Sequence, residues 1–222
     1  MNLAQIPKHK ADHIAKKIAE ATKELRRLGK DYHRRGWCLG TSGNFSVVLE
    51  HDPLLVLVTA SGKDKSQLRK EDFAIVDENA TPIIKDGPKP SAEALLHVTA
   101  IKHTGAGAVL HTHSVWSTIL SEKHFKNRSL TIEGYEMLKG LDGIKTHETK
   151  EEFPIFDNSQ DMKEFAENLS DKFNENDNNL EWAYLIRKHG MHTWGKTLKE
   201  AKRHVEIMEF LLEAQGRLEG GQ

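Results

Sequence analysis

The chain has 222 residues, 37% of them apolar, which is enough to bury one sizeable core. Its 32 Lys and Arg nearly balance 33 Asp and Glu, so a net charge of −1 provides no field that would attract nucleic acid or an anionic membrane. No run approaches the roughly 18 apolar residues of a membrane span. Cys38 is the only cysteine, which excludes an intrachain disulfide and suits a reducing compartment. We therefore expect residues 1–222 to form one cytoplasmic domain whose partners are small molecules.

Apolar periodicity predicts the elements of the first part of the chain. Apolar residues at helical spacing predict an amphipathic helix over 14–28, with basic residues on its solvated face. Two β-rich runs, 45–49 and 54–58, flank His51-Asp52-Pro53, and this pattern is typical of a hairpin. A further short strand is predicted over 73–76.

The rest of the chain alternates helices and short strands. A helix is predicted from Ser91, a candidate N-cap, to near Gly105. The later elements are a strand over 108–113 with a helix starting at Ser114, a helix over 162–173, a strand over 182–187 and a helix over 198–218. Short strands interleaved with longer helices predict an α/β sandwich with helices around a central sheet.

A His-Thr-His triplet at the end of the 108–113 strand is a candidate metal site. Residues two apart in a strand point to the same face, so His111 and His113 can share one ion. Neutral imidazoles suit Zn²⁺, Fe²⁺ or Ni²⁺, and catalytic sites commonly use three protein ligands. His189 occupies the matching place after the 182–187 strand. Spacing alone leaves other candidates for the third ligand, namely His97, His103, His192 and His204.

Two glycine-bearing turns precede the triplet, Gly40-Thr41-Ser42-Gly43-Asn44 and Thr59-Ala60-Ser61-Gly62-Lys63. Hydroxyls and free backbone N–H groups in such turns can bind a phosphate. The start of the helix expected at Ser91 adds further N–H groups and a favourable dipole. The alternative is that these segments are ordinary turns and a helix cap.

Two glutamates in mostly apolar segments are candidate acids or bases. Glu93 lies in Pro90-Ser91-Ala92-Glu93, and Glu136 lies in Gly134-Tyr135-Glu136-Met137. A buried carboxyl can have its pKa raised toward neutrality, which suits proton transfer. A surface position is the alternative for each of them.

Taken together, these motifs resemble those of the class II aldolase and adducin family, which contains metal-dependent sugar-phosphate aldolases, epimerases and dehydratases. The resemblance runs from about Gly36 to Leu212. Its carriers, in order, are Gly40–Ser46, Thr59–Gly62, Pro90–Glu93, His111–Ser114, Lys188–Gly190 and Trp194–Lys196. The resemblance implies a three-layer α/β/α sandwich with a mostly antiparallel sheet, assembled as a homotetramer.

The resemblance also implies roles for individual residues. One Zn²⁺ per subunit would be held by His111, His113 and His189. Glu136 would be the catalytic acid or base, with Glu93 as a second candidate that binds metal or moves a proton in the aldolases. The substrate phosphate would lie against Ser42, Gly43, Asn44, Ser61, Gly62, Lys65 and Ser91.

Within the family, two segments favour the dehydratase branch that acts on a methylthio-substituted ketose phosphate. They are Gly134–Gly140 and Arg187–Gly195. Family aldolases and epimerases use a tyrosine near the C-terminus, whereas no tyrosine follows Tyr184 here. The alternatives are an aldolase or 4-epimerase of a pentulose or deoxyhexulose phosphate, and an adducin-like structural module. Such a module would not be expected to keep three metal histidines.

Overall fold

The structure is a computed structural model that describes residues 8–175 and 179–220. Its helices are α1 (Lys8–Arg34), α2 (Ala94–Thr104), α3 (Val115–Lys123), α4 (Met162–Phe173) and α5 (Leu198–Gly220), with short 3-10 turns η2 (Lys65–Gln67), η3 (Phe125–Asn127) and η4 (Glu136–Gly140). Its strands are β1 (Asn44–His51), β2 (Leu54–Thr59), β3 (Phe73–Val76), β4 (Ala108–Thr112), β5 (Ser129–Glu133), β6 (Lys150–Phe156), β7 (Ala183–Ile186) and β8 (Gly190–Gly195).

The strands of the described residues form one eight-stranded sheet in the order β3-β2-β1-β4-β8-β7-β6-β5. Neighbouring strands are antiparallel except for β6 and β7, which run parallel. The predicted hairpin of β1 and β2 is confirmed, with Val47 opposite Leu57. Among the described helices, none is both long and apolar enough to cross a membrane.

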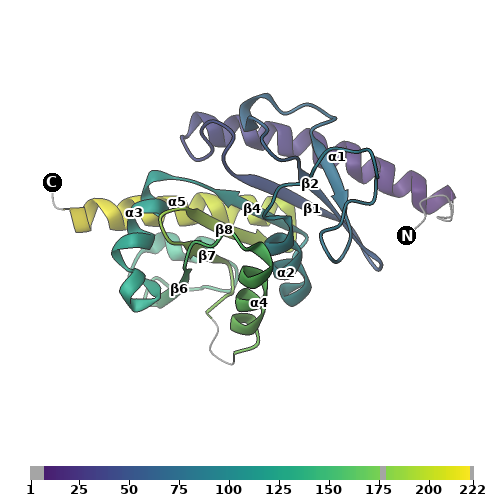
Figure 1. Ribbon diagram of the computed structural model, residues 1–222. Coiled ribbons are helices and arrows are strands. Elements are labelled where there is room, and N and C mark those ends of the chain that lie inside the picture. The colour runs from purple at the N-terminus through teal and green to yellow at the C-terminus, as the bar shows by residue number, and fades with distance from the viewer. Residues whose placement is uncertain (1–7, 176–178, 221–222) are drawn as a thin grey trace.

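Side chains of the central strands alternate between the two faces of the sheet, and helices cover both faces. On β2, Val56 and Val58 pack in the core beneath α2 and α4, whereas Leu55 and Leu57 pack in the core beneath α1 and the start of α5. Figure 1 shows α2 and α4 side by side, with α5 running along the other side of the sheet. The expected α/β/α sandwich with a mostly antiparallel sheet is confirmed.

Two features differ from the sequence prediction. Helix α2 begins at Ala94 rather than at Ser91, because the segment before it is extended against the end of β2. The Ser61 N–H donates to the Lys89 carbonyl and the Ser91 N–H donates to the Thr59 carbonyl, so the chain turns into the helix only afterwards. Strands β5, β6 and β8 were not predicted, although β8 lies at the centre of the sheet.

Candidate metal centre

The His-Thr-His triplet lies in the middle of the sheet. Strand β4 pairs with β1 on one side and β8 on the other, and His111 lies opposite Asn44 and His192. His113 follows the last residue of the strand. The two imidazole ring centroids are 4.5 Å apart, as expected for residues i and i+2 on one face. The prediction that these two histidines lie together is confirmed.

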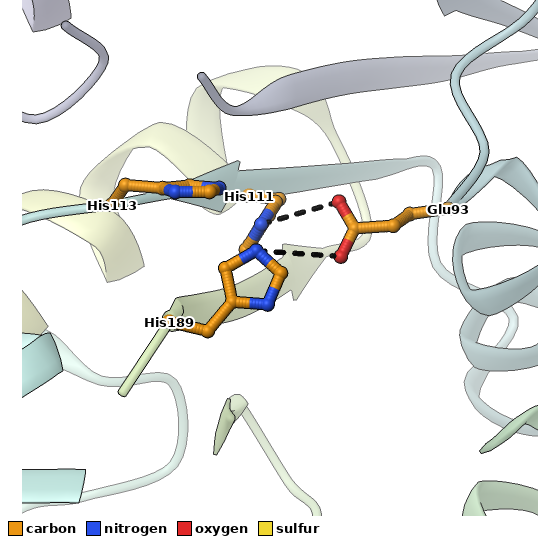
Figure 2. Close-up of side chains that lie close together, drawn as sticks. All are labelled: Glu93, His111, His113 and His189. Carbon is orange, nitrogen blue, oxygen red and sulfur yellow. Dashed lines mark ion pairs between the residues drawn. The ribbon is translucent and has the colours of Figure 1, made fainter. Parts of the chain in front are cut away.

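His189 and Glu93 complete a cluster with the triplet. His189 is in the tight turn between β7 and β8, and its ring lies 5.0 Å from that of His111 and 4.5 Å from that of His113. Figure 2 shows the Glu93 carboxylate facing His111 and His189. Its oxygens lie 3.3 Å from the His111 Nε2 and 3.8 Å from the His189 Nε2. One ligand atom from each of the four residues lies within 4.8 Å of the others.

The protonation state of His111 suits metal binding. Its Nδ1 lies 3.0 Å from the Met191 carbonyl, which can only accept, so Nδ1 carries the proton and Nε2 presents a lone pair to the cluster. Burial, then the neighbouring histidines, lowers the pKa of His111 well below its usual value and that of His113 to about 2. Within the described residues, the His111 Nε2 and the Glu93 Oε1 have no hydrogen-bond partner. Three imidazoles and a carboxylate at this spacing therefore fit a divalent transition metal.

The Glu93 carboxylate is held in place by Asn44. The Asn44 side-chain amide donates to the Glu93 Oε2 at 2.6 Å, and only 11% of the Glu93 side chain is exposed. Asn44 is the first residue of β1, and Glu93 immediately precedes α2. Asn44, which the family resemblance assigns to phosphate binding, therefore also orients the carboxylate of the cluster.

The other candidate third ligands have different surroundings. His192 is fully buried with its ring stacked on that of His111 at 4.0 Å, and His97 bonds to the Ser46 hydroxyl. His204 donates from Nδ1 to the Trp194 carbonyl. His103 lies against Ser170 on α4. None of these four belongs to the ligand cluster found among the described residues.

The residues expected to bind phosphate line one cavity of about 270 Å³ next to the metal cluster. They come from the turn before β1, the turn after β2 and the segment before α2. The cavity is lined by Ser42, Gly43, Asn44, Ser61, Gly62, Lys65 and Ser91, together with Glu93, His113 and His189. Segments far apart in sequence thus meet as expected, and their binding of phosphate stays a prediction.

Lys65 is nearly inaccessible to solvent, at 1% exposure, although it lines this cavity. Its ammonium donates to the Thr41 carbonyl at 2.9 Å and to the Lys63 carbonyl at 2.6 Å. These two carbonyls belong to the two glycine-bearing turns. Lys65 therefore ties the turns together and brings a positive charge beneath them, and burial lowers its pKa.

Glu136 lies apart from this cluster. It is the first residue of η4, its side chain is 70% exposed, and it pairs with Lys139 at 2.7 Å and His147 at 3.4 Å. The apolar character of its segment belongs to its neighbour Leu138, which is buried. The Lys139 ammonium lowers the pKa of Glu136, so the side chain is a charged surface carboxylate within its own chain.

A third glutamate, Glu209, packs against β4 on the face of the sheet opposite His111. Glu209 of α5 is buried, and its Oε1 accepts from the Thr112 hydroxyl at 2.8 Å. Burial raises the pKa of Glu209 to about 7, against the opposing effect of hydrogen bonds from Ser114 and Thr112. A hydrogen bond thus joins the end of β4, next to His111, to α5 on the opposite face of the sheet.

Three residues that line the cavity were not identified from the sequence. Ser159 and Gln160 belong to the segment that joins β6 to α4, and Met162 is the first residue of α4. The polar run Asn158–Asp161 before a helix was a signal for a loop at a strand end, where ligand groups often gather. This run could be placed at a strand end only if β6 had been predicted, and the sequence pattern did not predict β6.

Comparisons with known proteins identify one family. A family model described as the Class II Aldolase and Adducin N-terminal domain matches residues 23–216. A methylthioribulose-1-phosphate dehydratase from Picosynechococcus sp. is 43% identical over 188 residues, which cover 84% of this chain and 86% of the relative. Another of the same name, from Pectobacterium carotovorum subsp. carotovorum, is 44% identical over 182 residues, covering 82% and 86%.

A solved structure has the same fold. The L-fuculose-1-phosphate aldolase from Thermus thermophilus matches with a TM-score of 0.68 and 25% identity, over 92% of this chain and 100% of that one. Together with the family match, it confirms the resemblance expected from the motifs. The chain therefore belongs to the class II aldolase and adducin family.

Proposed function

We propose that this chain removes water from 5-methylthioribulose 1-phosphate to give 2,3-diketo-5-methylthiopentyl 1-phosphate, a step of methionine salvage. The observation that carries the proposal is the similarity to two dehydratases of that name over more than four fifths of each chain. The site supports it, because a cluster suited to a metal lies beside a cavity suited to a phosphate.

The proposed metal is one Zn²⁺ per chain, held by His111, His113 and His189, with Glu93 as the facing carboxylate. Three neutral imidazoles favour zinc over magnesium, which prefers oxygen ligands. Zinc in this position would supply Lewis-acid chemistry, which stabilises negative charge that develops on the substrate oxygens. Glu93 offsets part of the positive charge and is itself oriented by Asn44.

The phosphate is proposed to bind in the cavity formed by the two glycine-bearing turns and Ser91. The turns offer hydroxyls and the N–H groups of their glycines, whereas the Ser42, Ser61 and Ser91 N–H groups already donate to backbone carbonyls. The buried Lys65 adds a charge that stays in place. Anchoring this end fixes the sugar carbons against the metal cluster. Binding energy from the phosphate then serves orientation of the reacting carbons.

The reaction needs a base and an acid. A base takes the proton from C3, which gives an enediolate across C2 and C3. The C4–O bond then breaks, and the C4 hydroxyl leaves with one proton as water. The resulting enol tautomerises to the 2,3-diketone. General acid–base help of this kind typically contributes about 10²–10⁴-fold.

We propose that Glu136 is this base and that it acts in the active site of a neighbouring copy. The family resemblance implies the role, whereas Glu136 belongs neither to the cluster of its own chain nor to the lining of the cavity. A homotetramer is part of the same proposal. Its support is that α3, which starts directly after His113 and Ser114, exposes Val115 at 63% and Ile119 at 47%. A copy that covered these apolar side chains would lie next to the metal centre.

The size of the cavity also supports a shared site. Ligand sites usually measure about 300–1,000 Å³. The single chain provides about 270 Å³ beside the metal cluster. A wall added by a second copy would enclose the substrate and exclude water from the enediolate.

Steady-state assays of the zinc-loaded protein test the proposal. The substrates are methylthioribulose 1-phosphate, ribulose 5-phosphate and fuculose 1-phosphate, with product formation followed for dehydration, epimerisation and aldol cleavage. We expect dehydration of the first at a kcat/KM at least 100-fold above any reaction of the others. Absence of dehydration, with turnover of either other substrate, would establish the aldolase or epimerase alternative.

A further inference from the structure

The cavity beside the metal cluster has one large apolar side chain in its lining, that of Met162. The other lining residues of the described chain are glycines, alanines, hydroxyl and amide residues, histidines, a lysine and a glutamate. Met162 is the first residue of α4 and is half-buried. Among the described walls of this cavity, a large apolar side chain is thus present at one place only.

The position of Met162 relates it to the metal cluster. Helix α4 packs against α2, and the side chain of Met162 packs on the core that includes Ala94. Ala94 follows Glu93 directly in the chain. Met162 therefore approaches the cavity from the layer of α2 and α4, whereas the glycine-bearing turns approach it from the ends of β1 and β2.

The start of α4 is capped from within the chain. The Asp161 carboxylate accepts from the backbone N–H groups of Lys163 and Glu164 at 3.0 and 3.1 Å, so the helix is capped by its own residue. What α4 presents to the cavity is a flexible, polarisable thioether. Methionine adapts its shape to irregular apolar groups and gains from dispersion contacts with sulfur.

The substrate of the proposed function has two chemically different ends. The phosphate on C1 requires N–H groups and positive charge, and the methylthio group on C5 requires an apolar contact and no hydrogen bond. With the phosphate in the turns and C2 and C3 at the metal cluster, C5 extends beyond the cluster. We propose that Met162 contacts the methylthio group there and selects the substrate against ketose phosphates that carry a hydroxyl on C5. This inference rests on the proposed function.

The test compares two substrates that differ only at C5, methylthioribulose 1-phosphate and ribulose 1-phosphate. Met162→Ser removes the apolar contact, and we expect it to lower kcat/KM for the methylthio substrate about 10- to 100-fold, mainly through KM. For ribulose 1-phosphate we expect a change within about twofold. If ribulose 1-phosphate turns over too slowly, its inhibition constant against the methylthio substrate gives the same comparison.

Two further variants serve as controls. Met162→Leu keeps an apolar surface of similar size and should remain within about threefold of the wild type for both substrates. Lys163→Ser places serine in the same helical turn at an exposed position, and it should leave kcat/KM for both substrates unchanged. Zinc content of every variant is measured by elemental analysis, so that loss of metal is not mistaken for loss of selectivity.

Each outcome decides between the two claims. Equal losses for both substrates in Met162→Ser, or no loss for either, would overturn the role of Met162 while leaving the dehydratase in place. A wild-type protein that dehydrates neither substrate would overturn the proposed function and, with it, this inference.

Discussion

Glu93 and Glu136 look alike in the sequence, since each is a single acid in a mostly apolar segment, yet their surroundings differ. Glu93 is 11% exposed, accepts a hydrogen bond from Asn44 and faces two histidines. Glu136 is 70% exposed and pairs with Lys139 and His147. The chemistry of a carboxylate therefore depends on the segments that meet around it, which the residues adjacent in sequence do not reveal.

The two glutamates therefore suit different roles. A carboxylate enclosed with imidazoles is suited to hold a metal ion, because the ion would compensate its buried charge. A carboxylate on the surface can act on a substrate only where another copy presents one. The two glutamates should therefore respond differently to the same substitution.

The largest effect is expected from His111→Ala, which removes one of the proposed metal ligands. This histidine is buried in the middle of the sheet and presents Nε2 to the cluster. We expect loss of stoichiometric zinc and a fall in kcat/KM on the order of 10⁴-fold or more, because Lewis-acid stabilisation is lost. Elemental analysis and steady-state kinetics measure both, with the exposed His51→Ala as control. Zinc retained at one per chain in His111→Ala and in His189→Ala would refute the assigned ligands.

Glu136→Gln tests whether the exposed glutamate is the catalytic base. We expect zinc content to stay at the wild-type level while kcat falls about 10²–10⁴-fold, since the base is lost and the ligands remain. Glu133→Gln, at a neighbouring exposed position, should be silent. Near-normal turnover of Glu136→Gln would mean that the proton carrier lies elsewhere.

A mixing experiment sharpens the same prediction. Copies carrying Glu136→Gln and copies carrying His189→Ala are each expected to be inactive. If sites are shared, reassembled mixtures contain sites with both residues intact, and activity should return to about a quarter of the wild-type level for random 1:1 association. No recovery in demonstrably mixed oligomers would contradict a shared site.

Glu93→Gln should have a smaller effect, and it should weaken zinc binding rather than remove the base. The amide keeps an oxygen for Asn44 but removes the negative charge that faces His111 and His189. We expect zinc affinity to fall about 10- to 100-fold and activity to recover at high zinc concentration. Competition with a chelator measures the affinity. A large loss of kcat in the fully zinc-loaded variant would instead assign proton transfer to Glu93.

Glu209 extends the comparison to a carboxylate that is buried without a cation. Its folded-state pKa of about 7 lies above the usual 4.5, so the folded chain keeps a proton that the unfolded chain has lost. Stability from this group is present at pH below 4.5 and is lost as the pH rises to 7, on the order of 3 kcal/mol in all.

Chemical unfolding of the metal-free protein at pH 5 and pH 8 checks this prediction. Glu209→Gln cannot ionise and should gain stability relative to the wild type as the pH rises. Glu167→Gln, at an exposed position on α4 away from Glu209, should follow the wild-type profile. A constant difference between Glu209→Gln and the wild type across this range would show that Glu209 does not titrate there.

The central part of the site could be predicted from the sequence because each component is local. His111 and His113 share a face by strand geometry alone, and His189 was placed by the end of a recognisable strand. The glycine-bearing turns carry their signal in a few adjacent residues. Apolar periodicity found α1, α4, α5 and the β1–β2 hairpin for the same reason.

The remaining parts depend on contacts between distant segments. Strands β5 and β6 pair with each other at the edge of the sheet; β5 alternates apolar with polar side chains over only five residues, and β6 does not alternate and contains a proline. The start of α2 is set by pairing of Ser91 with Thr59, and the orientation of Glu93 is set by Asn44. The single-domain organisation over residues 1–222 stays a prediction.

The spacing of the metal cluster along the chain has a consequence for folding. Its residues run from Glu93 to His189, and they converge only when β4 has paired with both β1 and β8. A metal ion bound by this cluster would not organise a short early intermediate, unlike zinc bound by ligands a few residues apart. Since contacts of long sequence separation form late, metal capture should be among the last events of folding, and metal release should report on disruption of the whole sheet.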